Sequence, residues 1–151
     1  MQNKYNDQLT NLPNRFALME YIESLDYANV FLIDIDNFSN VNDAYGFEFG
    51  DNVLIEVARL IDIAKPLGSK LFRINSDEFV VVFLDVMSSK QLSSLASSMI
   101  SFFDHMEMSV SDDIDVRISI SIGIAIGRGS DIVNHARVAI KEIRKHRRGF
   151  F

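Results

Sequence analysis

The sequence contains no cysteine, so the chain forms no disulfide bond and offers no thiolate ligand to a metal ion. This absence permits a reducing compartment, and we expect the protein to be cytoplasmic. Long apolar runs are missing as well, since no stretch approaches the length of a membrane span and the N-terminus has no signal-peptide pattern. We therefore expect no membrane contact by this chain.

Internal repeats, linkers and low-complexity tracts are also absent from the sequence. With 151 residues, 48% of them hydrophobic and 12 of them phenylalanine, the chain is large enough to bury one core. We expect residues 1–151 to form a single domain. The abrupt ends of the chain suggest that it is excised from a longer multidomain protein.

The acidic net charge of −6 hides an asymmetry. Residues 135–148 contain six basic residues against one acidic residue, a local sum of +5, so the remainder of the chain sums to −11. An acidic body with one basic segment is not typical of a nucleic-acid-binding surface. It suits a small phosphorylated ligand better.

The first half of the chain is predicted from apolar spacing and capping residues. We expect, in order, a helix capped by Thr10 or Asn11 with Pro13 in its first turn, a buried strand over 30–36, a short helix that stops at Gly46, and a helix that Asp51 caps and that ends at Pro66 and Gly68.

The second half of the chain is predicted in the same way. We expect a tight hairpin of strands 70–74 and 79–84, a helix over about 88–105, a strand over 117–127 and a final helix capped by Ser130. Ser88 and Gln91 have the spacing of a capping box. The last strand alternates isoleucine with small residues, so its isoleucines should face the core and its small residues should let a helix approach closely.

The order of these elements predicts an α+β fold. A strand–helix–strand–strand–helix–strand core is the split βαβ, ferredoxin-like plan, in which an antiparallel sheet has helices on one face. In that plan, the end of the strand that holds Asp34 lies near the hairpin that holds Asp77 and Glu78.

These acids are the first candidates for a functional site. Carboxylate oxygens suit a hard divalent cation, most simply Mg²⁺ bound together with substrate phosphates. Asp34 or Asp36 alone is better explained as a helix N-cap or a solvated strand end. Acids at two strand ends that are distant in sequence favour the metal site.

Four motifs carry a resemblance to a known family. DQLTNLPNR (7–15), DIDNFSNVNDAYGFEFGD (34–51), RINSDEF (73–79) and SISIGIA (119–125) resemble, in order and spacing, the signatures of the GGDEF domain of diguanylate cyclases. The resemblance covers nearly the whole chain and implies a core shared with nucleotidyl cyclases. It also implies condensation of two GTP molecules into cyclic di-GMP by a transient homodimer.

The resemblance implies roles for individual residues. Asp34, the backbone carbonyl of Ile35, and Asp77 would bind the metal, and Asp77 with Glu78 would serve catalysis. The guanine edge would be bound by Asn42 and Asp51, and the terminal phosphates by Arg144 and Arg148. Asp51 also has the ordinary explanation of a helix cap, Asn42 that of a residue near a turn, and the two arginines that of a solvated basic face.

The departures from the family pattern point toward lost activity. Asn75 and Ser76 replace the two signature glycines, which would permit unusual backbone angles and close approach of the nucleotide. A phosphate-contacting lysine is replaced by Ser39 and a histidine by Phe47. Elsewhere, Asn11 replaces a glycine, and Arg137 replaces an aspartate.

The segment 66–69 also departs from the family pattern. Its sequence, PLGS, occupies the place of the Arg-x-x-Asp motif through which the product inhibits the enzyme. Pro66 and Ser69 provide neither a guanidinium nor a carboxylate group. We therefore expect no feedback inhibition through this segment.

The sequence thus predicts a degenerate GGDEF domain with little or no cyclase activity. It would act as a GTP-binding or dimerising regulatory module linked to a sensory or phosphodiesterase domain. Two alternatives remain open: an active diguanylate cyclase with an altered turn, and a structural module that binds no nucleotide.

Overall fold

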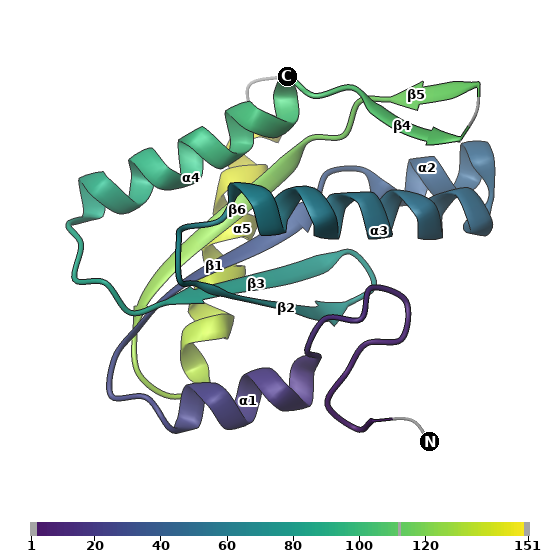
Figure 1. The fold of residues 1–151 in the computed structure, drawn as a ribbon. Coiled ribbons are helices and arrows are strands. Elements are labelled where there is room, and N and C mark those ends of the chain that lie inside the picture. The colour runs from purple at the N-terminus through teal and green to yellow at the C-terminus, as the bar shows by residue number, and fades with distance from the viewer. Residues whose placement is uncertain (1–2, 112, 150–151) are drawn as a thin grey trace.

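The computed structural model describes residues 3–111 and 113–149, and side chains as far as residue 145 (Figure 1). The helices in this part of the chain are α1 (Arg15–Glu23), α2 (Phe38–Tyr45), α3 (Phe47–Ala64), α4 (Ser89–Asp104) and α5 (Asp131–Gly149). The strands are β1 (Ala28–Ile35), β2 (Lys70–Asn75), β3 (Glu78–Phe83), β4 (Met108–Ser111), β5 (Ile114–Val116) and β6 (Ile120–Gly127).

The main sheet has the strand order β2-β3-β1-β6, and every neighbouring pair in it is antiparallel. This order confirms the split βαβ fold that the sequence predicts. The central strand β1 pairs with β3 on one side and with β6 on the other, so its C-terminal end meets the start of both neighbours.

The helices of the split βαβ core lie on one face of the sheet, as predicted, and the first and last helices cover the other face. Helices α3 and α4 lie on one face, and α1 and α5 lie on the other (Figure 1). On β1, Phe31 and Ile33 pack into the core with α3 and α4, whereas Val30 and Leu32 pack into the core with α1 and α5. A strand that is buried on both faces needs a continuous apolar run, and the segment VFLI provides one.

The N-terminal segment differs from its prediction. Helix α1 begins at Arg15, and its cap is Asn14, whose side chain accepts a hydrogen bond from the backbone N–H of Ala17. The predicted caps lie several residues earlier, where Asn11 adopts the left-handed conformation with φ 61°. Asparagine tolerates that region better than most residues, which is consistent with its standing in place of a glycine.

The prediction that Asp51 caps a helix is also wrong. Gly46 ends α2 with φ 89° and is followed at once by α3, which begins at Phe47. Asp51 therefore lies inside α3, on its exposed side. A glycine with positive φ turns the chain within a single residue, so two helices follow each other with no room for a separate capping loop.

Other predicted elements are confirmed. Helix α4 begins with the complete capping box, in which Ser88 and Gln91 exchange hydrogen bonds with each other's backbone N–H groups. The β2–β3 hairpin and the short helix α2 lie where they are predicted. The small β4–β5 hairpin was missed, although its Met108–Ser111 strand alternates apolar and polar residues.

Strand β6 is buried on both faces over most of its length. Ser121, on the small-residue face, is 1% exposed, as the predicted approach of a helix requires. Ile126, near the end of the strand, is 43% exposed, so its predicted place in the core is wrong. The predicted close approach of a helix is confirmed at Gly123, where a Cβ atom would lie 2.0 Å from the carbonyl oxygen of Ala136 in α5.

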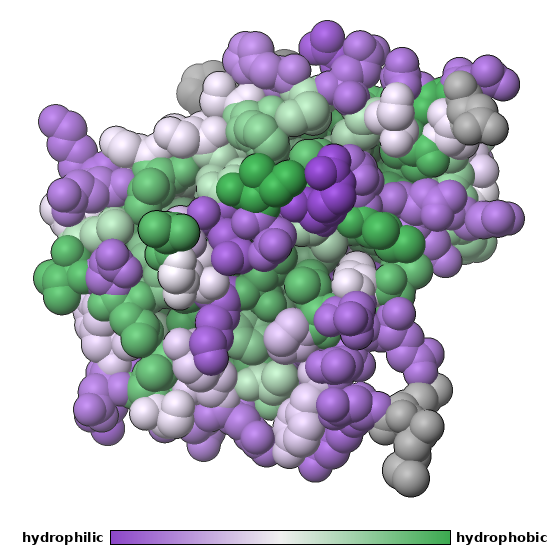
Figure 2. Space-filling view, in the orientation of Figure 1, coloured by the Kyte–Doolittle hydropathy of each residue, from purple (hydrophilic) through white to green (hydrophobic). Residues whose placement is uncertain are grey.

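None of the helices in the described part of the chain is long and apolar enough to cross a membrane. Figure 2 shows apolar surface between α4 and α3. A hollow of about 330 Å³ lies there, lined by residues that include Ala64, Leu95 and Phe102.

Candidate functional site

The acids predicted to converge lie together at the end of the main sheet where β1 ends and β3 begins. Asp34 on β1 lies directly opposite Glu78 on β3 and opposite Ser121 on β6. Asp77 belongs to the turn before β3, and its carbonyl oxygen accepts a hydrogen bond from the N–H of Ile35 at 3.2 Å. The split βαβ topology therefore brings the ends of three strands to one place.

Asp34 and Asp36 share an arginine from the last helix. Arg144 on α5 donates to Oδ2 of Asp34 at 2.9 Å and to Oδ1 of Asp36 at 3.1 Å. The side chains of Asp34 and Asp36 are 14% and 15% exposed, and that of Arg144 is 34% exposed. Charge-assisted hydrogen bonds in such a partly buried place hold the arginine across both carboxylates.

The environment separates the pKa values of the two carboxylates. Burial and the neighbouring charge of Asp77 raise the pKa of Asp34 to about 6, although the Arg144 guanidinium opposes this shift. Burial also raises the pKa of Asp36, but hydrogen bonds from Ser121, Ser119 and Arg144 outweigh it and hold that pKa below its usual value. Of the two carboxyl groups, Asp36 therefore loses its proton at lower pH, and Asp34 takes up a proton more readily.

Glu78 is held by a second arginine from α5. Arg137 donates to Oε1 of Glu78 at 3.0 Å and to its Oε2 at 3.5 Å, and the side-chain amide of Asn75 also donates to Oε1. Burial raises the pKa of Glu78, but the bonds from Arg137 and Asn75 outweigh it and lower that pKa. Asn75 and Arg137, which both depart from the family pattern, therefore both donate hydrogen bonds to the carboxylate of Glu78.

The turn that contains Ser76 folds without left-handed residues. Among the described non-glycine residues, only Asn11 and Asn37 have positive φ, so Asn75 and Ser76 do not adopt the unusual angles that glycine would permit. In this structure the turn therefore does not depend on the backbone freedom of glycine. What the two residues add to the site is side-chain volume and the contact of Asn75 with Glu78.

An arginine that the sequence interpretation did not single out organises this turn. Arg73 on β2 donates to the carbonyl oxygen of Ser76 at 2.7 Å and pairs with both carboxylate oxygens of Asp7 at 2.9 and 3.0 Å. Asp7 also accepts bonds from the backbone and the hydroxyl of Thr10. The first motif of the sequence thus supports the turn of the third.

A cavity of about 450 Å³ opens beside the acids. It is lined by Ile35, Asp36, Asn37, Phe38, Ser39, Asp77, Ser119 and Arg144. Its position between the expected metal ligands and the expected phosphate-binding arginine suits a phosphate group. Ser39, which replaces a lysine, lies in this lining and brings no charge to it.

The two residues expected to bind guanine lie on α2 and α3. Asn42 on α2 packs against Gly50, where a Cβ atom would lie 1.8 Å from Asn42 Oδ1. That oxygen is buried and has no hydrogen-bond partner among the described residues. Asp51 is exposed and follows Gly50 directly. Arg148 belongs to α5, but its side chain lies outside the described residues.

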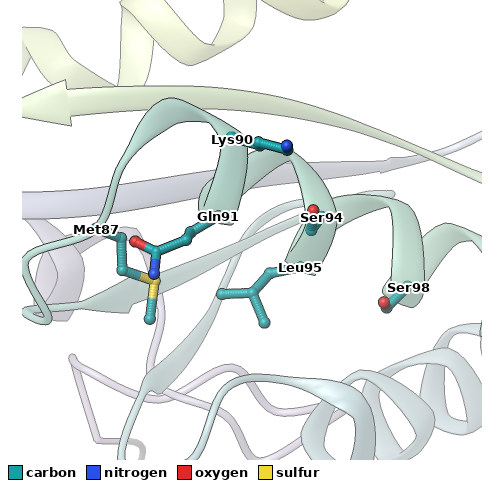
Figure 3. Close-up of a pocket in the computed structure, with 6 residues that line it drawn as sticks. All are labelled: Met87, Lys90, Gln91, Ser94, Leu95 and Ser98. Atoms are coloured by element: carbon teal, nitrogen blue, oxygen red, sulfur yellow. The ribbon is translucent and has the colours of Figure 1, made fainter.

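A second cavity, of about 460 Å³, lies along α4 (Figure 3). It is lined by Met87, Lys90, Gln91, Ser94, Leu95 and Ser98. Its lining contains one charged residue, Lys90, and no acid, so it offers neither a metal site nor an acid–base pair.

The residues present fit a divalent cation only in part. Among the described side chains, no three acids or histidines gather into a set that holds a metal by itself. Oδ1 of Asp34, however, is buried and has no hydrogen-bond partner in the described part of the chain. A buried carboxylate oxygen without a partner fits a cation whose other ligands come from a nucleotide and water.

Comparisons with known proteins identify relatives of this chain. A family model described as diguanylate cyclase, GGDEF domain, matches residues 4–149. The chain is 34% identical over 104 residues to diguanylate cyclase DgcN of Escherichia coli, covering 64% of this chain and 26% of that protein. It is 36% identical over 101 residues to cyclic di-GMP phosphodiesterase PdeR of the same species, covering 63% of this chain and 15% of that protein.

Solved structures resemble the whole domain. A sensory box/GGDEF family protein from Caulobacter crescentus has a TM-score of 0.84 at 25% identity, covering 94% of this chain and 99% of that chain. The GGDEF domain of DgcB from the same species, solved in complex with c-di-GMP, has a TM-score of 0.84 at 21% identity, covering 97% and 93%. The latter likeness concerns the fold alone.

Proposed function

The chain belongs to the diguanylate cyclase GGDEF family, and on this premise we propose that it is a degenerate member with little or no cyclase activity. It binds GTP or a related guanine nucleotide and acts as a regulatory or dimerising module of cyclic di-GMP signalling. The observation that carries this proposal is that two arginines of the protein form ion pairs with the acids of the site. Arg144 bridges Asp34 and Asp36, and Arg137 holds Glu78.

The retained residues support nucleotide binding. Asp34, the carbonyl of Ile35, and Asp77 would hold Mg²⁺ together with the nucleotide phosphates. When bound, the cation offsets the charge of the phosphates and helps to activate the attacking hydroxyl. Asn42 and Asp51 bind the guanine edge in this proposal, and Arg144 and Arg148 bind the phosphates.

Two features count against turnover. Ser39 offers the cavity no positive charge where phosphates must be positioned. Glu78, the acid next to Asp77, is already engaged by Arg137 and Asn75. Displacement of a reacting group by about 1 Å can cost on the order of 10²-fold in rate, so a site with altered contacts loses turnover before it loses binding.

The alternative function is an active diguanylate cyclase. It is favoured by the retention of Asp34, Asp77 and Glu78 beside a cavity. In that reaction, the 3′-hydroxyl of one GTP attacks the α-phosphorus of the other, its proton leaves, and pyrophosphate departs. The second such step closes the ring of cyclic di-GMP. Each subunit of a transient homodimer provides one GTP.

One experiment separates these functions. GTP is titrated into the protein by calorimetry with Mg²⁺ and again with excess chelator, and the same protein at high concentration is then assayed for cyclic di-GMP by chromatography. We expect Mg²⁺-dependent GTP binding with little or no product. Robust product would establish the active enzyme, and no GTP binding in either condition would leave a structural module.

The whole protein is proposed to contain further domains. The chain spans 26% of DgcN and 15% of PdeR, so both relatives have much sequence outside the matched region. By analogy with the name of PdeR, we propose a covalently linked sensory or phosphodiesterase domain as the partner that this module regulates. A cytoplasmic location follows from the same proposal, because GTP is the ligand.

A further inference from the structure

We infer that Arg137 sets the affinity of this site for divalent cations by neutralising Glu78. The inference rests on the proposed function, because it concerns the same acids, Asp34, Asp77 and Glu78. It assigns a positioning and charge-balancing role to a residue that lies on α5, outside all four signature motifs.

The contact is specific and well supported. Arg137 reaches Glu78 across 59 positions of sequence, with N–H···O distances of 3.0 and 3.5 Å. Its side chain is 24% exposed and that of Glu78 is 13% exposed, so solvent screens the pair only in part. A third bond, from the NH1 group of Arg137 to Asn134 at 3.1 Å, fixes the guanidinium from within α5.

Glu78 is placed to influence a cation at Asp34. The two residues are register partners on neighbouring antiparallel strands, and directly opposite Cβ atoms in such pairs lie about 4.5–5.5 Å apart. A carboxylate at that distance attracts a divalent cation bound to Asp34. With Arg137 attached, the pair has no net charge, and most of that attraction is cancelled.

Arg137 and Arg144 have separable roles, although they lie seven positions apart on the same helix. Arg144 lines the cavity beside the acids and is proposed to bind phosphate. Arg137 contacts Glu78 and Asn134 and is absent from that lining. Removing Arg137 therefore changes the charge near the cation and leaves the proposed phosphate contact in place.

The test measures Mn²⁺ binding by electron paramagnetic resonance, first with Mn²⁺ alone and then with GTP. We expect Arg137→Gln to bind Mn²⁺ roughly five- to tenfold more tightly than the unmodified protein, because one nearby positive charge is lost. Arg137→Lys should return the affinity to near its original value. The double variant Arg137→Gln with Glu78→Gln should also return it, since both charges of the pair are removed.

Arg59→Gln is the matched control. It breaks an arginine–glutamate pair on the exposed surface of α3 and should leave Mn²⁺ affinity unchanged. An unchanged or weaker affinity in folded Arg137→Gln would overturn the inference, as would a double variant that stays tight. If Arg137→Gln is not folded by circular dichroism, Arg137→Met takes its place with the same expected gain in Mn²⁺ affinity, and an unchanged or weaker affinity in that variant overturns the inference.

The Mn²⁺-only measurement keeps this inference distinct from the proposed function. If GTP binds to none of these proteins, the proposed nucleotide-binding function fails. The effect of Arg137 on Mn²⁺ alone still decides the role of Arg137, and the absence of measurable Mn²⁺ binding to Arg137→Gln, both alone and with GTP, would overturn the inference.

Discussion

Arg73 and Asp7 are joined by two hydrogen bonds, of 2.9 and 3.0 Å, that connect β2 to the segment before α1. The side chains are 11% and 21% exposed, so this is a largely buried ion pair. Removing one partner of such a pair leaves an uncompensated charge. The pair therefore fastens the N-terminal motif to the turn that precedes β3.

We expect Arg73→Gln to lower the free energy of unfolding by about 2–4 kcal/mol, because Asp7 loses its partner and the carbonyl of Ser76 loses a donor. Urea denaturation followed by circular dichroism measures this change. Arg59→Gln is the control and should change stability by less than about 0.5 kcal/mol, since its pair is solvent-exposed. Equal small effects at both positions would contradict the prediction.

The turn can be tested by separating its backbone from its side chains. Since Asn75 and Ser76 have negative φ, we expect Asn75→Ala with Ser76→Ala to raise GTP affinity as much as the corresponding double glycine variant does. Both double variants remove side-chain volume and the bond to Glu78, but only the glycine variant frees the backbone. Calorimetric titration of GTP with Mg²⁺ compares the two variants. A gain confined to the glycine variant would show that backbone freedom matters.

Turnover requires more than the turn. We expect measurable cyclic di-GMP only after Ser39→Lys is added to the double glycine variant, because that position lines the cavity and has no charge. Chromatography at high protein concentration is the assay, since the reaction needs two subunits. Vigorous synthesis of cyclic di-GMP by the unmodified protein would refute the proposal that the domain has little or no cyclase activity. A triple variant that binds GTP but forms no cyclic di-GMP would place the defect in dimer formation.

A dependence of stability on pH follows from Asp34. Its folded pKa, about 6, lies above the ordinary value of 3.8, so the folded protein binds this proton more tightly than the unfolded chain does. The associated stability is present below about pH 4 and is lost as the pH rises through 6. One pKa unit corresponds to about 1.4 kcal/mol and solvent screens part of this shift, so we expect Asp34→Asn to abolish a decline on the order of 1–3 kcal/mol across that window. Urea denaturation at a series of pH values measures it, and parallel curves for both proteins would contradict the assignment.

The segment 66–69 should not bind cyclic di-GMP. Ser69 is 7% exposed, and its hydroxyl donates to the carbonyl of Pro66, so it is occupied within its own loop. We expect no shift of the backbone amide resonances of residues 66–69 when the dinucleotide is added at millimolar concentration. Crystals soaked with the dinucleotide provide a second check. Density for it against this loop would disprove the prediction.

Much of the fold follows from local pattern. The apolar run of β1, the capping box of α4 and the stop at Gly46 each reflect a few neighbouring residues, and the structure confirms them. The misplaced start of α3 has a local cause too, since Gly46 both ends α2 and precedes α3 without a capping loop. The cover on the second face of the sheet comes from α1 and α5, which lie outside the split βαβ core, and the apolar run of β1 is consistent with burial on both faces.

The site was harder to predict because its contacts are distant in sequence. The convergence of Asp34 with Glu78 follows from strand order, which the pattern of elements predicts. The engagement of those acids by Arg144 and Arg137 does not follow, because an ion pair across 110 or 59 positions leaves no local signal. The roles in binding and catalysis stay predictions until they are measured.

Gly123 has no functional group, yet its lack of a side chain bears on the charges of the site. It lets the backbone of α5 lie against β6 at Ala136, where a Cβ atom would come within 2.0 Å of the carbonyl oxygen. A side chain at 123 would push this part of α5 away from the sheet, and Arg137, the residue after Ala136, would move away from Glu78 with it. A larger residue at 123 would therefore weaken the ion pair between Arg137 and Glu78 without contacting either residue.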